Sequence, residues 1–200
     1  DPADVESLRW AIRDRNGSGF LFLNNYQRHL HMTDKTDLAI HVTSGKERLD
    51  FPKFTLSSGR YCILPYNLPL GKFLLKSATA QLLCRMTSQE EDYYFFFSYP
   101  DLQPRYIFAK DEVKTIHSTR AEITETDNHF TANVTQPGLQ SVITLQAHTG
   151  SSVHLVTLTR QQAENTWKAN LWRRDRIVIS AGDVTFTDDK TVSYTHLTLP

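Results

Sequence analysis

Apolar and polar residues alternate with a period of two along much of this chain. In residues 8–13, apolar side chains alternate mainly with charged ones, which gives an extended strand one apolar and one charged face. Asn16-Gly17-Ser18-Gly19 then supplies residues that tolerate the positive φ angles of a tight turn. Residues 20–23 (Phe-Leu-Phe-Leu) are apolar on both faces. The pattern predicts a β-hairpin whose second strand is covered on both sides.

Short apolar runs separated by glycine, proline or serine turns continue through the chain. Further strands are predicted at residues 38–42, 48–51, 54–56, 61–64, 72–77, 81–86, 93–97, 112–116, 120–124, 130–134, 142–145 and 153–158, and in a closing pair at residues 176–180 and 184–187. The segment from Pro65 to Gly71 contains two prolines, which lack the backbone donor of a central strand. We therefore expect an ordered loop there.

One helix is predicted, near residues 160–170. Thr159 and Gln162 have the spacing of a capping box, in which each side chain binds the other residue's free backbone N–H. Ala163, Trp167 and Leu171 follow four residues apart and would form a narrow apolar stripe. The pattern as a whole favours an all-β fold of antiparallel β-sandwich modules with one short helix near residues 160–170.

A change of texture near residue 110 predicts a boundary between two subdomains. The strands after it contain fewer apolar residues and more polar ones than the strands before it. We expect a β-sandwich subdomain at residues 1–109 and a second antiparallel β subdomain, with the short helix, at residues 110–191. Residues 192–200 (Val-Ser-Tyr-Thr-His-Leu-Thr-Leu-Pro) resemble a translated sequencing adapter, so we expect a non-native tail there.

Charge and composition exclude little, but they disfavour two classes of partner. The 22 Lys and Arg residues balance 22 Asp and Glu residues, which gives no electrostatic reason to expect nucleic acid or an anionic membrane surface. No apolar run reaches the ~20 residues of a membrane span, so no span is predicted. Cys62 and Cys84 lie in apolar runs, which predicts buried free thiols, with a disulfide as the alternative.

The residues that could catalyse a reaction or bind a metal stand in unpromising settings. The carboxylates of residues 90–92 and 188–189 lie in polar turns, where solvent keeps a carboxyl pKa near its ordinary value. Such a pKa suits neither carboxyl role in a glycosidase. His29 and His31 would share one face of a strand, but a third metal ligand would have to come from elsewhere. We therefore assign no catalytic residue, no metal site and no cofactor.

Aromatic residues are the remaining candidates, because sugar rings stack on aromatic faces. The candidates are Tyr26, Tyr66, Tyr93, Trp167 and Trp172, with a place in the core or at a domain interface as the alternative. The charge run at residues 173–176 (Arg-Arg-Asp-Arg) is interpreted as the solvated end of the predicted helix. An interface patch is the alternative for that run.

From Gly19 to His29 the chain reads Gly-Phe-Leu-Phe-Leu-Asn-Asn-Tyr-Gln-Arg-His. This string resembles the segment that follows the catalytic barrel in β-galactosidases of glycoside hydrolase family 35, particularly the bacterial ones. The resemblance continues at residues 64–71, 78–81, 94–97, 158–169 and 183–186, and it spans residues 8–187. Leu64 stands where the family often has an aromatic residue, and the tail after Val192 matches nothing in the family.

The resemblance implies an accessory, non-catalytic β-sandwich segment of a retaining enzyme that hydrolyses terminal β-D-galactosyl residues. Its catalytic TIM barrel, with two glutamates, would lie upstream of Asp1, so no catalytic residue is carried over and the segment alone is predicted to be inactive. The expected partners are that barrel and, through the parent enzyme, a galactoside. We expect the parent to be periplasmic or secreted. Candidate carbohydrate or barrel contacts are Asn24, Asn25, Tyr26, Gln27, Arg28, Tyr66, Asn67 and Trp167.

Two other functions stay open at this point. An autonomous carbohydrate-binding module for galactosides would use one of the aromatic candidates as its platform. An independent hydrolase would need its own facing pair of carboxylates, for which the sequence offers no suitable setting.

Overall fold

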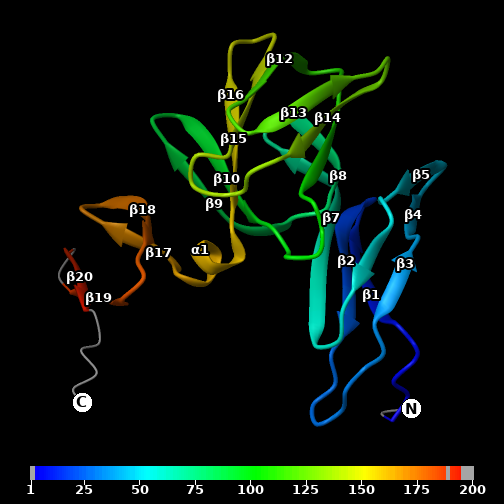
Figure 1. The fold of residues 1–200 in the computed structure, drawn as a ribbon. Helices are drawn as coiled ribbons and strands as arrows, with labels where there is room; N and C mark the ends of the chain where they lie inside the picture. Colours follow the sequence, from blue (N-terminus) through cyan, green and yellow to red (C-terminus); the bar gives the residue numbers. More distant parts are fainter. Residues whose placement is uncertain (1–2, 188–189, 195–200) are drawn as a thin grey trace.

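A computed structural model describes residues 3–187 and 190–194 of the chain (Figure 1). Most of the strands belong to two sheets. The larger sheet has the order β1 (Arg9–Arg15), β2 (Ser18–Asn25), β7 (Arg60–Leu70), β8 (Phe73–Ala78), β11 (Arg105–Ala109), β14 (His129–Val134) and β13 (Ala121–Glu125). The smaller has the order β12 (Val113–Ser118), β15 (Val142–Ala147), β16 (Ser152–Leu158), β10 (Glu91–Phe97) and β9 (Gln81–Ser88). The predicted all-β class is therefore confirmed.

The main core lies between these two sheets. Alternate residues of β8, β11 and β14 point inward from the larger sheet, among them Phe73 and Phe108, and meet Ile143 and Leu155 of the smaller one. Tyr106 is fully buried, and its hydroxyl lies 2.8 Å from the Thr157 hydroxyl of the opposite sheet. Each of these two hydroxyls thus has a partner, which removes most of the cost of burying it. One strand pair departs from the antiparallel rule, since β10 pairs with β16 in parallel.

The predicted loop from Pro65 to Gly71 is wrong, because Pro65 to Leu70 continue strand β7. Residues 60–66 of β7 pair with β2, and residues 66–70 pair with β8. Pro65 and Pro69 therefore each pair with a neighbouring strand on one side only, where a missing N–H can face away from the ladder. The reversal itself comes at Gly71, whose φ of 63° favours glycine.

Four short strands cover one face of β2 and β7. These are β3 (Lys35–Leu38), which pairs with β6 (Phe54–Leu56), and β4 (His41–Ser44), which pairs with β5 (Glu47–Asp50). Leu21 and Leu23 of β2 are buried beneath them with Phe51 and Phe54. Phe20 and Phe22 on the opposite face of β2 are only half-buried, so the prediction that β2 is covered on both sides is wrong.

The predicted helix is confirmed only over its first half. Helix α1 (Arg160–Glu164) has the expected capping box between Thr159 and Gln162. The residues that follow form strand β17 (Thr166–Leu171), which pairs with β18 (Arg174–Ile179). Residues four apart share a face in a strand as well as in a helix, so the Trp167–Leu171 spacing fits both. Both α1 and the β17–β18 hairpin lie against the outer face of the smaller sheet, around Phe95 and Val156.

The C-terminal strands pair differently from the prediction. Strand β19 (Asp183–Thr187) pairs with β20 (Lys190–Tyr194) rather than with β18. Residues 192–194, at the start of the predicted non-native tail, therefore belong to β20. Residues 188–189 and 195–200 lie outside the described part of the chain.

The boundary predicted near residue 110 does not divide the chain into one sheet before it and another after it. Each sheet contains strands from both sides of that residue, and the pairs β11–β14 and β10–β16 cross it. Cys62 is buried and Cys84 half-buried, and both are free thiols, as predicted. Among the described residues no helix is long and apolar enough to cross a membrane.

Candidate functional site

The loop from Asn24 to Arg28 is held by its own asparagines. The Tyr26 N–H donates to Asn24 Oδ1 at 2.9 Å, which closes a tight turn after β2. Asn25 is fully buried, and its Nδ2 donates to the carbonyl oxygens of Leu56 at 2.9 Å and Thr33 at 3.0 Å. Gln27 accepts a hydrogen bond from Arg9. Tyr26, 51% exposed, and Arg28, also exposed, are the two side chains that this loop presents to solvent.

Tyr66 and Asn67 anchor the β1–β2 turn at the opposite end of β2. The buried Tyr66 hydroxyl donates to Asp14 Oδ2 at 2.7 Å, and Asn67 Nδ2 donates to the Gly17 carbonyl at 3.1 Å. Burial raises the pKa of Tyr66 to about 12, and the Asp14 carboxylate acts in the same direction. Tyr66 is therefore a neutral donor rather than a sugar platform.

The eight predicted contact residues do not form one site. In the pairing of β2 with β7, Tyr66 lies opposite Gly19 at one end, whereas Asn24 and Asn25 lie at the other. Trp167 is half-buried on β17, in the hairpin that covers the smaller sheet. Figure 1 shows this hairpin, in orange, on the other side of the molecule from β1 and β2.

Strand β1 exposes large apolar side chains along an open sheet edge. It is the terminal strand of the larger sheet, and Trp10 is 65% exposed and Ile12 40% exposed. Both side chains share a face with buried residues of β2, since Trp10 pairs with Leu23 and Ile12 with Leu21. Arg13 and Arg15 point to the other face. The pattern of residues 8–13 had predicted an apolar face here, but not that it is open to solvent.

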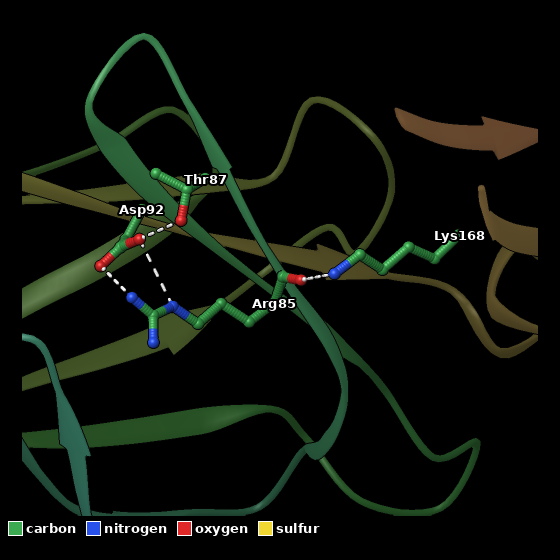
Figure 2. Close-up of polar contacts among 4 residues, drawn as sticks. All are labelled: Arg85, Thr87, Asp92 and Lys168. Carbon is green, nitrogen blue, oxygen red and sulfur yellow. Dashed lines mark hydrogen bonds and ion pairs between the residues drawn. The ribbon is translucent and has the colours of Figure 1, made fainter. Parts of the chain in front are cut away.

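A polar cleft of about 1110 Å³ lies between the β9–β10 turn and the β17–β18 hairpin. Its walls include Arg85, Thr87 and Glu90 on one side and Lys168 and Asp175 on the other. Lys168 Nζ joins the two walls, because it lies 3.0 Å from the Arg85 carbonyl oxygen (Figure 2) and 2.9 Å from Asp175 Oδ2. Sequence reasoning missed this cleft, because it placed the charge run at residues 173–176 after a helix rather than in a hairpin.

Asp92 fixes the Arg85 side chain beside this cleft. Arg85 donates to both Asp92 carboxylate oxygens, at 3.3 and 2.8 Å, and the Thr87 hydroxyl donates to Asp92 at 2.7 Å (Figure 2). Burial would raise the pKa of Asp92, but the hydrogen bonds from Thr87 and Arg85 outweigh it and hold the pKa below its ordinary value. An ionised Asp92 cannot serve as a general acid at neutral pH.

The carboxyl groups with a clear pKa shift all move in the direction that disfavours acid catalysis. Hydrogen bonds from Ser7 lower the pKa of Asp4 to about 2, and the hydrogen bond from Lys168 lowers that of Asp175. The Glu91 carboxylate oxygen Oε2 lies 3.0 Å from His154 Nε2, and His154 Nδ1 lies 3.0 Å from the Thr144 hydroxyl. No cluster of three or more potential metal ligands occurs among the described residues.

Neither a scan against models of protein families nor a search of curated proteins finds a match to this chain.

Proposed function

We propose that this chain is an accessory, non-catalytic β-sandwich segment of a family 35 β-galactosidase, which docks on the catalytic barrel of its parent enzyme. The exposed edge strand β1 supports the proposal most directly. Trp10 is 65% exposed on a strand that has no paired strand on its outer side within the described residues. Soluble proteins usually protect such edges with charges, bulges or prolines, and β1 carries charges at Arg13, Asp14 and Arg15. Trp10 and Ile12 nevertheless leave an exposed apolar face, and aromatic residues and arginines are enriched at interfaces.

The surroundings of Trp10 suit an interface with a large, rigid partner. Ile12 extends the apolar surface along the strand, and Arg9 is held by its hydrogen bond to Gln27. The exposed Tyr26 lies next to Gln27 in the same loop. A catalytic barrel placed before β1 in the parent chain would cover this edge without a long linker.

The activity of the purified chain is the first test of this proposal. We expect no hydrolysis of 4-nitrophenyl β-D-galactopyranoside above the uncatalysed rate, because the resemblance places both catalytic glutamates on the barrel of the parent enzyme. The carboxyl groups of Asp92 and Asp175 have lowered pKa values, whereas a general acid needs a raised one. Turnover that persists through a second purification step would refute the accessory role. The reading frame upstream of Asp1 should encode a barrel with two glutamates at strand ends, and an unrelated domain there would also contradict the proposal.

A substitution at the edge strand tests the docking surface. In the parent enzyme, Trp10→Ala should lower the midpoint of thermal unfolding, because it removes an aromatic anchor from the interface. In the isolated chain it should change stability little, since the side chain is 65% exposed. The matched control is Trp172→Ala, which removes a tryptophan that is 61% exposed on the β17–β18 hairpin. Equal effects of the two variants in the parent would count against docking through β1.

A galactoside-binding module is the second candidate, favoured by the exposure of Tyr26 beside Arg28. Calorimetric titration of the chain with β-1,4-galactan separates the two functions. Binding that is lost in Tyr26→Ala would support the module, whereas a flat titration leaves the docking role.

A further inference from the structure

The cleft between the β9–β10 turn and the β17–β18 hairpin is rich in positive charge. Five cationic side chains line it (Arg85, Lys168, Arg173, Arg174 and Arg176), against the carboxylates of Glu90 and Asp175. Such an excess is local, because the whole chain has a net charge of zero. A cleft whose lining carries an excess of one charge attracts ligands of the opposite charge.

Only some of these cations are neutralised by the protein itself. Arg85 is held by both oxygens of Asp92, and Lys168 pairs with Asp175. Arg173 and Arg174 have no ion pair within the part of the chain that the structure describes. Both side chains are exposed at the rim of the cleft. Two guanidinium groups are thus available to a ligand, and each presents a planar fork that matches a carboxylate or sulfate.

An exposed aromatic ring lies beside these arginines. Trp172 is 61% exposed, and it occupies the tight turn of the hairpin with Arg173. Both residues have positive φ angles, of 52° and 60°, which bulky side chains rarely adopt. The Arg176 guanidinium carbon lies 5.9 Å from the centre of the Trp172 ring. That contact restrains the indole next to Arg173 and Arg176, which line the cleft, and leaves it a firm surface on which a ring can stack.

Hydroxyl and amide groups complete the lining. Thr87, Ser88, Gln89 and Asn170 stand between the charged residues, and the volume of about 1110 Å³ lies above the ~300–1,000 Å³ usual for small-molecule pockets. Polar groups of this kind bind sugar hydroxyls, and a tryptophan face binds the apolar side of a sugar ring. We infer that this cleft binds an oligosaccharide that carries anionic groups, either uronate carboxylates or sulfate esters.

Nucleic acid fits the cleft less well. Binding along a phosphate backbone uses an extended basic track with several stacking aromatics. Here the basic residues are confined to one cleft, and acidic Glu90 and Asp175 stand among them. An anionic oligosaccharide would bind the hydroxyl and amide groups of the lining as well as its cations.

Titration of the full chain at low ionic strength tests the inference. The probes are an oligogalacturonate, a sulfated galactan oligosaccharide of matched length and a neutral β-1,4-galactotetraose. We expect at least one anionic probe to bind, with a change in tryptophan fluorescence, and the neutral probe to bind at least about tenfold more weakly. Loss of one charge-assisted hydrogen bond is enough for such a ratio. Which anionic probe binds distinguishes carboxylate from sulfate.

Arg173→Asn together with Arg174→Gln should weaken that binding by about tenfold or more. Asparagine tolerates the left-handed backbone of position 173, so the hairpin should be kept, and circular dichroism with thermal unfolding checks this. The matched control removes two cations from another exposed hairpin, with Lys46→Gln and Arg48→Gln. It should leave the affinity within about twofold, because neither residue lines the cleft.

Four outcomes would overturn the inference. They are no binding of either anionic probe, equal binding of the neutral probe, an equal loss in the control variant, and equally tight binding of an oligothymidylate of the same charge. The last would show a general attraction for polyanions. None of these results bears on docking through β1, which lies on the other side of the molecule (Figure 1).

Discussion

The residues that make the sequence distinctive between Gly19 and Asn67 hold the ends of strands β1 and β2 in place. Tyr66 and Asn67 bind the β1–β2 turn through Asp14 and the Gly17 carbonyl. Asn25 binds two carbonyl oxygens of neighbouring segments from a fully buried position. Their polarity thus serves the backbone, because a buried carbonyl or amide without a partner costs free energy.

Gly19 is required by close contact rather than by its backbone angles. A Cβ atom there would lie 2.1 Å from the Arg13 carbonyl oxygen and 2.7 Å from the Tyr66 hydroxyl. We expect Gly19→Ala to lower the free energy of unfolding by about 3 kcal/mol, the upper end of the cost of overpacking. Urea denaturation measures this. Gly45→Asn is the control, because a Cβ meets nothing within 4 Å there, and it should change stability by less than about 0.5 kcal/mol.

The buried tyrosine and thiol make stability fall at alkaline pH. Burial raises the pKa of Cys62 from 9.0 to about 12 and that of Tyr66 from 10.0 to about 12. The unfolded chain loses these protons first, so stability is complete below about pH 9 and declines as the pH rises toward 12. Tyr66→Phe should lower stability at pH 7 by about 1.5–3 kcal/mol, since the bond to Asp14 is lost.

The same variant should also show a shallower decline between pH 9 and 10.5. Urea midpoints at several pH values over that range measure both effects. A decline as steep as that of the wild type would contradict the raised pKa of Tyr66.

At this scale the sequence could identify which residues matter but not what they contact. Asn24 to Arg28 were predicted as one polar contact surface. Instead, the side chains of Asn24 and Asn25 form hydrogen bonds with backbone groups of the chain itself. Whether a side chain faces inward depends on strands far away in the sequence, such as β6 beneath Asn25. The charge run at residues 173–176 was visible, but the cleft exists only because the hairpin lies against β9.

Among the elements, α1 is the one whose local signal decides its structure. Its capping box satisfies two backbone N–H groups, with Thr159 Oγ1 3.2 Å from the Gln162 nitrogen and Gln162 Oε1 3.1 Å from the Thr159 nitrogen. The helix then ends at Glu164 because each of residues 166–171 pairs with a residue of β18 in an antiparallel ladder. Tertiary pairing overrides a helical spacing that is only one apolar stripe wide.

Removing the cap should therefore loosen the helix and the hairpin that follows it. We expect Thr159→Ala to lower the free energy of unfolding by about 1 kcal/mol. Thr159→Ser keeps the acceptor oxygen and should restore most of the loss. The same urea titration measures both variants, and equal losses would show that the methyl group, not the capping bond, matters.

Period-two patterning predicted most strands, and the exceptions have physical causes. Strand β7 runs through two prolines because each pairs with a single neighbour. Strand β11 was not predicted, although Tyr106 and Phe108 alternate there and are fully buried. It lies between Pro104 and the polar segment after Lys110, a setting that favours a loop rather than a strand. The parallel pairing of β10 with β16 joins segments that lie far apart in the sequence, so a local pattern cannot predict it.

For the molecule as a whole, the core is shared between segments on either side of residue 110. Leu75 and Phe108 come from one side, and Phe130, Ile143 and Leu155 come from the other. Fragments 1–109 and 110–191 would each expose half of this core and lose the partners of β11 or β16. We therefore expect neither fragment to unfold cooperatively in urea, because burial of apolar area is the main source of stability.

Mixing the two fragments should restore part of the transition, since the missing strands are then supplied in trans. Truncation after Gly182 is the matched control. It removes only β19 and β20, which pair with each other, so the shortened chain should keep a single transition. A cooperative transition in fragment 1–109 alone would contradict the shared core. It would show that the β2–β7 cluster around Leu21 and Leu64 is enough for an independent domain.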